Sequence, residues 1–138
     1  MPRRLLTSLA ALWLTTAVSA AAQASADSAS GLLQARQFTE WFYTGQKDSV
    51  WAHLDDASRQ EVGTPADLAR QLDQATRQVG SEMDVVEENL RVADGKTIYN
   101  RLAKFSRSDE PIVLQWVFTR GGQITSFGLS PESPAGKR

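Results

Sequence analysis

The stretch IVLQWVFTRGGQITSFGLSP, residues Ile112–Pro131, decides the fold. Two apolar runs flank a turn at Thr119–Gly122, and Pro131 closes the second run. In the first run, Ile112, Leu114, Trp116 and Phe118 alternate with Val113, Gln115 and Val117. Because successive side chains of a strand point to opposite faces, both faces of this strand are largely apolar. The sequence predicts a central strand at 112–118 and a hairpin that returns at 123–129.

A second hairpin is predicted just upstream. Asp94-Gly95 is a strong turn signal between two runs with strand character, residues 83–92 and 96–105. In the second of these runs one face carries Tyr99, Arg101, Ala103 and Phe105, and the other carries Ile98, Asn100 and Leu102. Alternation in the first run is lost at Val85-Val86, and Glu82 and Asp84 are predicted to share a face. The four runs together predict an antiparallel sheet of four strands.

Three helices are predicted ahead of the sheet. GLLQARQFTEWFYTGQ, residues 31–46, has apolar residues at helical spacing, with Ser30 as N-cap and Gly45 at the end. KDSVWAHLDDASRQEVG, residues 47–63, predicts one short helix capped by Asp48. Thr64-Pro65 starts the third helix, which ends at Gly80. We therefore expect an α+β fold in which three N-terminal helices pack on a curved four-stranded antiparallel sheet, forming a cone with an open end.

The first residues are typical of a secretory signal peptide. A positive start at Arg3-Arg4 precedes an apolar run, and Ala22-Gln23-Ala24 is a small-x-small cleavage pattern. We expect a signal peptide at 1–24, a flexible tether at 25–30, the folded domain at 31–131 and a disordered tail at 132–138. A retained N-terminal anchor is the alternative. The expected location is the periplasm or the medium, with no membrane span after cleavage.

Composition excludes several classes of function. The net charge is −1, without a concentrated basic face, so we expect no nucleic-acid partner. There is no cysteine, and therefore neither a disulfide framework nor a lipid attachment site. His53 is the single histidine, which rules out a two-histidine metal motif. No cofactor motif and no nucleophile elbow are present, and we assign no catalytic residue and no metal ligand.

Four polar residues are candidates for a ligand pocket: Tyr43, Tyr99, Arg101 and Gln115. Tyrosine and arginine at the mouth of a cone can bind a carbonyl or a carboxylate, so the expected ligand is a small apolar molecule or a carboxylate. The alternative is that these are ordinary half-buried sheet residues. A group of carboxylates, Glu82, Asp84, Glu87 and Glu88, is predicted to protect a sheet edge, and the alternative is an active carboxylate pair. A cross-strand ion pair of this group with Arg101 is compatible with edge protection.

The chain resembles the NTF2-like (cystatin-like α+β cone) superfamily, and more narrowly the small exported domains of unknown function that are joined to serine hydrolases. The resemblance rests on FTEWFYTGQKDSVWAHLDD at 38–56, VLQWVF at 113–118, Gly121-Gly122 and ITSFGLSP at 124–131. It implies that the last two strands belong to the core of a curved sheet. It also implies that two copies pair through their sheets.

The function expected from these features is an exported, non-catalytic binding or protein-interaction domain of the bacterial envelope, acting as a homodimer or with an envelope protein. One alternative is a small-molecule acid/base enzyme that uses the cone. Another is an accessory subunit of an envelope hydrolase. A buried carboxylate within hydrogen-bond reach of Tyr43 or Tyr99 would support the enzyme, whereas apolar surface on the sheet would support the interaction domain.

Overall fold

The fold is α+β, with four helices followed by one antiparallel sheet. The computed structural model describes residues 20–132. The elements are α1 (Ala20–Tyr43), α2 (Lys47–His53), α3 (Asp56–Val62), α4 (Pro65–Val79), β1 (Glu82–Ala93), β2 (Lys96–Phe105), β3 (Ile112–Thr119) and β4 (Ile124–Pro131). Most of the predicted signal peptide and nearly all of the predicted tail lie outside the described residues. None of the described helices combines the length and the apolar character that crossing a bilayer requires.

The first helix begins earlier than the sequence predicts. α1 starts at Ala20, so it runs through residues 25–30, for which a tether was predicted, and Ser30 is an interior residue and not an N-cap. Alanine is the strongest helix former, and its frequency before Gly31 lets the helix continue upstream. The predicted end is confirmed, because α1 stops at Tyr43 and Gly45 follows with a φ of 72°.

Two helices replace the single one predicted at 47–63. Leu54 is extended, with a ψ of 139°, and it forms a parallel bridge with Ile124 of β4. This pairing interrupts the helix, and Asp55 then caps α3 by accepting a hydrogen bond from the Ser58 amide at 2.8 Å. The sequence pattern missed the break because Leu54 also fits the apolar face of a continuous helix. The contact that favours the extended conformation is with a residue far along the chain.

The start and end of α4 are as predicted. The Thr64 side chain accepts a hydrogen bond from the Asp67 amide, and the Asp67 side chain accepts one from the Thr64 amide, which is a complete capping box. Gly80 ends the helix with a φ of 81°. A Cβ atom there would lie 2.2 Å from the Ser106 Oγ atom, so no larger residue fits this position.

The sheet has the order β1-β2-β3-β4 and is antiparallel throughout. Asp94 and Gly95 have φ values of 53° and 72°, as the predicted tight hairpin between β1 and β2 requires. Irregular pairing between Glu82 and Asp84 breaks the two-residue period, so Glu82 lies opposite Phe105 and Asp84 opposite Lys104. The prediction that Glu82 and Asp84 share a face is therefore wrong, and the cause is this bulge.

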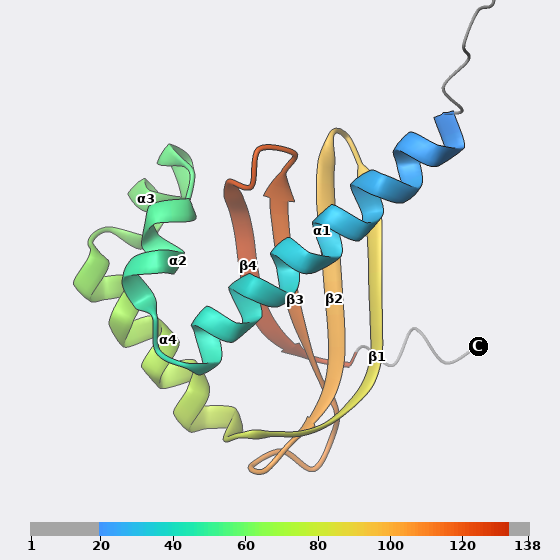
Figure 1. Cartoon of the computed structure of the whole chain (residues 1–138). Coiled ribbons are helices and arrows are strands. Elements are labelled where there is room, and N and C mark those ends of the chain that lie inside the picture. Colours follow the sequence, from blue (N-terminus) through green and yellow to red (C-terminus); the bar gives the residue numbers. More distant parts are fainter. Residues whose placement is uncertain (1–19, 133–138) are drawn as a thin grey trace, which may run out of the picture.

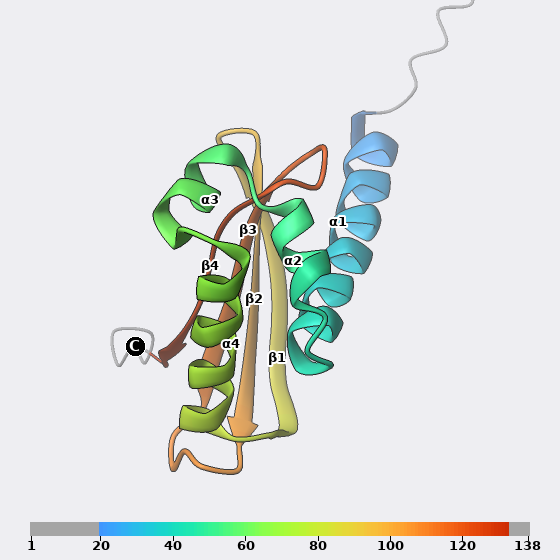
Figure 2. The same cartoon turned by 90° about the vertical axis from the view of Figure 1, so that its left-hand side faces the viewer.

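The helices contribute to a core on one face of the sheet, which we call the covered face. α1 crosses this face diagonally (Figure 1), and in Figure 2 α1 and α2 lie together on one side of the strands. On the covered face, the strand side chains that are buried include Tyr99, Ala103, Phe105, Ile112, Leu114, Trp116 and Phe118. Trp116 is 0% exposed and donates from Nε1 to the Thr39 Oγ1 atom of α1 at 3.1 Å. Trp116 and Phe118 belong to this core, as the resemblance implies for the last two strands, whereas Phe127 is half-buried and packs against it.

The opposite face, which we call the open face, has no buried side chain among the described residues. It is formed by the residues of each strand that point away from α1. The sheet is an open one, with β1 and β4 at its edges, and the predicted cone is not confirmed.

Candidate functional site

The structure brings together three of the four predicted pocket residues and separates the fourth. Tyr43 ends α1, and Tyr99 and Arg101 lie on the covered face of β2. Gln115 lies on the open face of β3, because its neighbour Trp116 points into the core. The four residues therefore belong to two different sites.

Arg101 is at the centre of the first site. Its Nε and Nη2 atoms donate to the two carboxylate oxygens of Glu82 at 3.0 and 2.6 Å. Its Nη1 atom donates to Glu88 Oε1 at 3.1 Å and contacts the Tyr99 hydroxyl at 3.4 Å. The side chains of Arg101, Glu82 and Glu88 are 18%, 15% and 21% exposed, so the ion pairs are largely shielded from water.

Two tyrosines and a second arginine complete the arrangement. The Tyr43 hydroxyl donates to Glu82 at 2.5 Å, and the Tyr99 hydroxyl donates to Glu88 at 2.6 Å. Arg36 of α1 reaches Glu88 across the covered face, with Nη2 2.8 Å from Oε2. We call the whole set the Arg101 cluster; its members are Arg36, Tyr43, Glu82, Glu88, Tyr99 and Arg101.

Three members of the cluster, Arg36, Glu82 and Glu88, were absent from the predicted pocket. A signal for Glu88 was present in the sequence, since the Asp94-Gly95 hairpin places Glu88 opposite Arg101, and the structure shows an ion pair between them. No comparable signal existed for Glu82, because its face depends on the bulge. Arg36 reaches Glu88 only through the crossing of α1 over the sheet.

Every titratable group of the cluster is held in its ordinary charge state. A hydrogen bond from Arg36, supported by bonds from Tyr99 and the charge of Arg101, lowers the pKa of Glu88 to about 2. Burial alone would raise the pKa of Glu82, but hydrogen bonds from Arg101 and Tyr43 outweigh burial and lower this pKa. Burial, followed by the hydrogen bond to Glu88, raises the pKa of Tyr99 to about 12.

Tyr43 and Arg101, which both bind Glu82, are likewise held in their ordinary charge states. Burial and the hydrogen bond to Glu82 raise the pKa of Tyr43, and the bond to Glu82 raises the pKa of Arg101. At neutral pH the carboxylates are thus ionised and the tyrosines protonated. General acid–base catalysis works best when a group titrates near the working pH, and these groups are far from it.

A cleft of about 600 Å³ lies beside the cluster, between α1, the end of α4 and the start of β1. Arg101 reaches its wall, but most of its N–H groups already bind Glu82, Glu88 and Tyr99. A ligand carboxylate would have to displace one of these internal carboxylates. In this arrangement Arg101 therefore lacks the two free N–H groups that a ligand carboxylate would need for a bidentate ion pair.

His53 has a packing role. Its ring lies 4.7 Å from the Trp41 ring and 5.7 Å from the Phe38 ring, centroid to centroid, and Nδ1 lies 2.8 Å from the Ser49 carbonyl oxygen. Within residues 20–132, no group of three or more histidine or acidic side chains is arranged to hold a metal ion.

The second site is the open face around Gln115. Its Nε2 atom donates to Asn100 Oδ1 on β2 at 2.9 Å, and Asn100 donates in turn to Asn89 on β1 at 3.3 Å. Aliphatic pairs lie on both sides of this amide row: Ile98 is opposite Val117, and Leu102 is opposite Val113. The open face thus presents an apolar pair, a polar pair and a second apolar pair along the two central strands.

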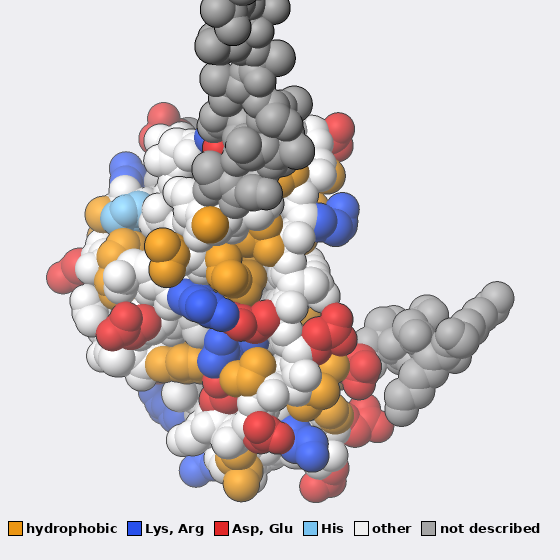
Figure 3. Space-filling model, turned by 45° about the vertical axis from the view of Figure 1, so that its right-hand side comes forward, with side chains coloured by type: hydrophobic (Ala, Val, Ile, Leu, Met, Phe, Trp, Pro, Cys, Tyr) orange, Lys and Arg blue, Asp and Glu red, His pale blue; other side chains and the backbone are white. Residues whose placement is uncertain are grey.

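A third surface lies where α1 runs beside the edge strand β1; we call it the α1–β1 side. The large apolar side chains that are exposed in the described residues all come from these two elements: Leu33, Tyr43, Met83, Val85, Val86 and Val92. Figure 3 shows hydrophobic side chains on this side of the molecule, with acidic and basic ones between them.

Comparison with known proteins gives no relative: no protein family, no curated protein and no solved structure matches the chain. The resemblance to the NTF2-like superfamily stays a prediction.

Proposed function

We propose that this chain is an exported, non-catalytic protein-interaction domain that forms a homodimer through the open face of its sheet. The observation that carries the proposal is the arrangement of Ile98–Val117, Asn100–Gln115 and Leu102–Val113 on a face that no described helix covers. Aliphatic side chains on a sheet are stabilised by burial, and a second sheet packed about 10 Å away would supply it.

The pattern is self-complementary. If a two-fold axis lies between two facing sheets, level with the Asn100–Gln115 pair, apolar pairs face apolar pairs and amides face amides. This holds whether the axis runs along the strands or across them. The central amides keep the hydrogen bond from Gln115 Nε2 to Asn100 Oδ1, and in the dimer the Gln115 Oε1 atom would face the amides of the second copy, which can donate to it.

Acid–base catalysis is the second candidate function. It is favoured by the Tyr43–Glu82 and Tyr99–Glu88 pairs, which are the carboxylate–tyrosine contacts that the enzyme hypothesis requires. An enzyme of this kind would need a carboxylate able to exchange protons near neutral pH. Arg36 and Arg101 hold both carboxylates ionised, which favours a structural role for the cluster.

The accessory-subunit hypothesis rests on the α1–β1 side. Leu33 and Val92 are 69% and 64% exposed, and a contiguous exposed apolar patch is a feature of protein contact sites. A partner on this side would leave the open face of the sheet available for the homodimer, so the two interactions are compatible.

A substitution at the centre of one apolar pair tests the homodimer. In Val117→Lys, two ammonium groups would face each other or an apolar surface across the interface, and we expect dimerisation to weaken by about 30-fold or more. Sedimentation velocity over a concentration series measures this. The wild-type protein is expected to dimerise at about 10 µM or below.

Leu33→Lys is the matched control, because it places the same charge on the α1–β1 side. It should leave the sedimentation profile of the wild-type protein unchanged. A wild-type protein that stays monomeric at about 1 mM contradicts the homodimer. A dimer that Leu33→Lys disrupts and Val117→Lys does not would place the interface on the α1–β1 side.

A further inference from the structure

Two charged side chains of the open face form no ion pair within the described part of their own chain. Arg91 and Glu87 are exposed residues of β1 that lie on either side of Asn89, on the same face of the strand. Four residues separate them, so their Cα atoms lie about 13 Å apart along the strand. Among residues 20–132 the Arg91 side chain has no hydrogen-bond or ion-pair partner, and Glu87 accepts one bond, from Asn89 at 3.4 Å.

The register of the sheet arranges the central residues of the open face in rows across the strands. The middle row, which we call the amide row, consists of Asn89, Asn100, Gln115 and Gly128. The row on one side of it consists of Arg91, Ile98, Val117 and Ser126, and the row on the other side consists of Glu87, Leu102, Val113 and Ser130. The two outer rows therefore match strand by strand: an aliphatic residue corresponds to an aliphatic residue, a serine to a serine, and the arginine to the glutamate.

We propose that the homodimer is built around a two-fold axis that runs across the strands, along the amide row, so that Arg91 of each copy forms an ion pair with Glu87 of the other. The inference rests on the homodimer proposed above and adds its symmetry and the charged residues that select it. A half-turn about this axis exchanges the two outer rows, so the arginine of one copy faces the glutamate of the second. Packed sheets lie about 10 Å apart, a gap that an arginine and a glutamate extended towards each other can span.

An axis along the strands gives no such pairing. It would run between β2 and β3 and exchange β1 with β4, so Arg91 and Glu87 would face Ser126 and Ser130 of the second copy. The apolar pairs face each other with either axis and do not distinguish the two. A serine hydroxyl carries no charge, and removing a charged group from water without an opposite charge is unfavourable. Charge complementarity therefore selects the axis across the strands.

The lysines at the two ends of β2 are compatible with this axis. The half-turn brings Lys96 of one copy towards Lys104 of the other, and both residues are exposed. Each lies about 13 Å from the amide row, and facing sheets cross at about 30°, so the two lysine backbones are offset sideways by about 7 Å as well as separated by the gap between the sheets. Their flexible stems can then carry the ammonium groups to the solvent.

Charge reversal tests the pairing, with dimerisation measured by sedimentation velocity over a concentration series at low salt. Arg91→Glu places carboxylates opposite each other in both halves of the interface, and Glu87→Arg places guanidinium groups there. We expect each variant to weaken dimerisation by about tenfold or more. The double variant Arg91→Glu/Glu87→Arg exchanges the charges and restores both ion pairs, so its dimerisation should return to within about threefold of the wild type.

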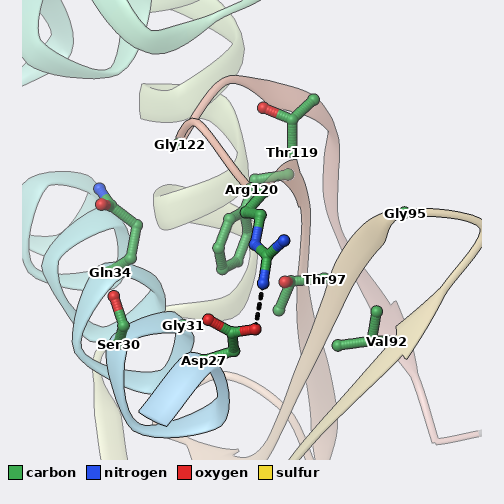
Figure 4. Close-up of a pocket in the computed structure, with 11 residues that line it drawn as sticks. Asp27, Ser30, Gly31, Gln34, Val92, Gly95, Thr97, Thr119, Arg120 and Gly122 are labelled. Atoms are coloured by element: carbon green, nitrogen blue, oxygen red, sulfur yellow. Dashed lines mark hydrogen bonds and ion pairs between the residues drawn. The ribbon is translucent and has the colours of Figure 1, made fainter. Parts of the chain in front are cut away.

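Arg120→Glu is the matched control. Arg120 belongs to the β3–β4 turn and is 76% exposed. Figure 4 shows its side chain directed towards α1, where it forms an ion pair with Asp27; both residues line a pocket of about 360 Å³. The variant makes the same change in net charge as Arg91→Glu, but away from the open face, so it should dimerise as the wild type does.

A cysteine on the axis gives a second, geometric measurement. With the axis across the strands, Asn89 of one copy faces Asn89 of the other across a gap of about 10 Å. With the axis along the strands, the same two residues would also be displaced sideways by three strand spacings, about 14 Å. We expect a short bis-maleimide to join two Asn89→Cys chains.

The possible failures of this inference and of the homodimer can be told apart. If the wild type dimerises but neither single reversal weakens the dimer more than Arg120→Glu does, the axis is wrong and the homodimer stands. The axis is also wrong if the double variant dimerises as weakly as the single ones, or if Asn89→Cys gives no covalent dimer. A wild-type protein that stays monomeric at about 1 mM contradicts the homodimer itself, and this inference with it.

Discussion

Replacing Arg101 by methionine is expected to lower the free energy of unfolding at pH 7 by about 3 kcal/mol. Methionine keeps an apolar stem like that of arginine but removes the guanidinium that binds both Glu82 and Glu88. Their carboxylates would stay largely shielded, Glu82 with Tyr43 as its remaining hydrogen-bond partner. Leaving a shielded carboxylate without its cation lowers the free energy of unfolding by more than the intact ion pair adds to it.

Urea denaturation, followed by tryptophan fluorescence, measures this loss. Arg36→Met is the matched control, since it removes the other arginine of the cluster. The Arg36 side chain is 51% exposed, so this variant should lose clearly less free energy of unfolding. In Arg101→Met the stability should partly recover as the pH falls, because the carboxylates can then take up protons. Equal losses for the two variants would contradict the central role of Arg101.

Acid is expected to destabilise the wild-type protein through the same carboxylates. The pKa of Glu88 is about 2 in the folded chain, below its ordinary value of 4.5, and the pKa of Glu82 is also lowered. A carboxylate whose pKa is depressed by folding stabilises the protein at a pH above its unfolded pKa. This contribution is lost as the pH falls from about 5 towards 2. Because solvent screens part of the interaction, we expect Glu88 to account for roughly 1–2 kcal/mol.

The measurement is the urea midpoint between pH 7 and pH 2 for the wild type and for Glu88→Gln. Glutamine keeps the shape and accepts hydrogen bonds but does not titrate. The variant should be less stable than the wild type at pH 7, and the difference should disappear near pH 2. A difference that stays constant across this range would show that the Glu88 pKa is not depressed.

The faces of the strands could be predicted from the sequence, because the two-residue period holds wherever the pairing is regular. Tyr99 and Arg101 were placed on one face and Asn100 on the other, as observed. The turn at Asp94-Gly95 also followed from local chemistry. Gln115 is a pocket candidate in the sequence, yet its neighbour Trp116 lies in the core. Since adjacent residues point to opposite faces, the same pattern already placed Gln115 away from the helices.

The rest depends on contacts between distant parts of the chain. The bulge that turns Glu82 towards Arg101 has no signature in the local sequence, and Leu54 is extended because it pairs with Ile124. The Asp27–Arg120 pair joins residues 93 positions apart, so neither charge suggests the other in the sequence. Such contacts arise only when α1 crosses the sheet and reaches the hairpin turns.

Crosslinking at the centre of the open face tests the proposed homodimer most directly. The chain has no cysteine, so Gln115→Cys introduces a single thiol beside the expected two-fold axis. Two packed sheets lie about 10 Å apart, a distance that a short bis-maleimide can span. We predict a covalent dimer for Gln115→Cys and little or none for Leu33→Cys under the same conditions. A Gln115→Cys protein that stays monomeric, or equal crosslinking of both variants, would contradict pairing through the open face.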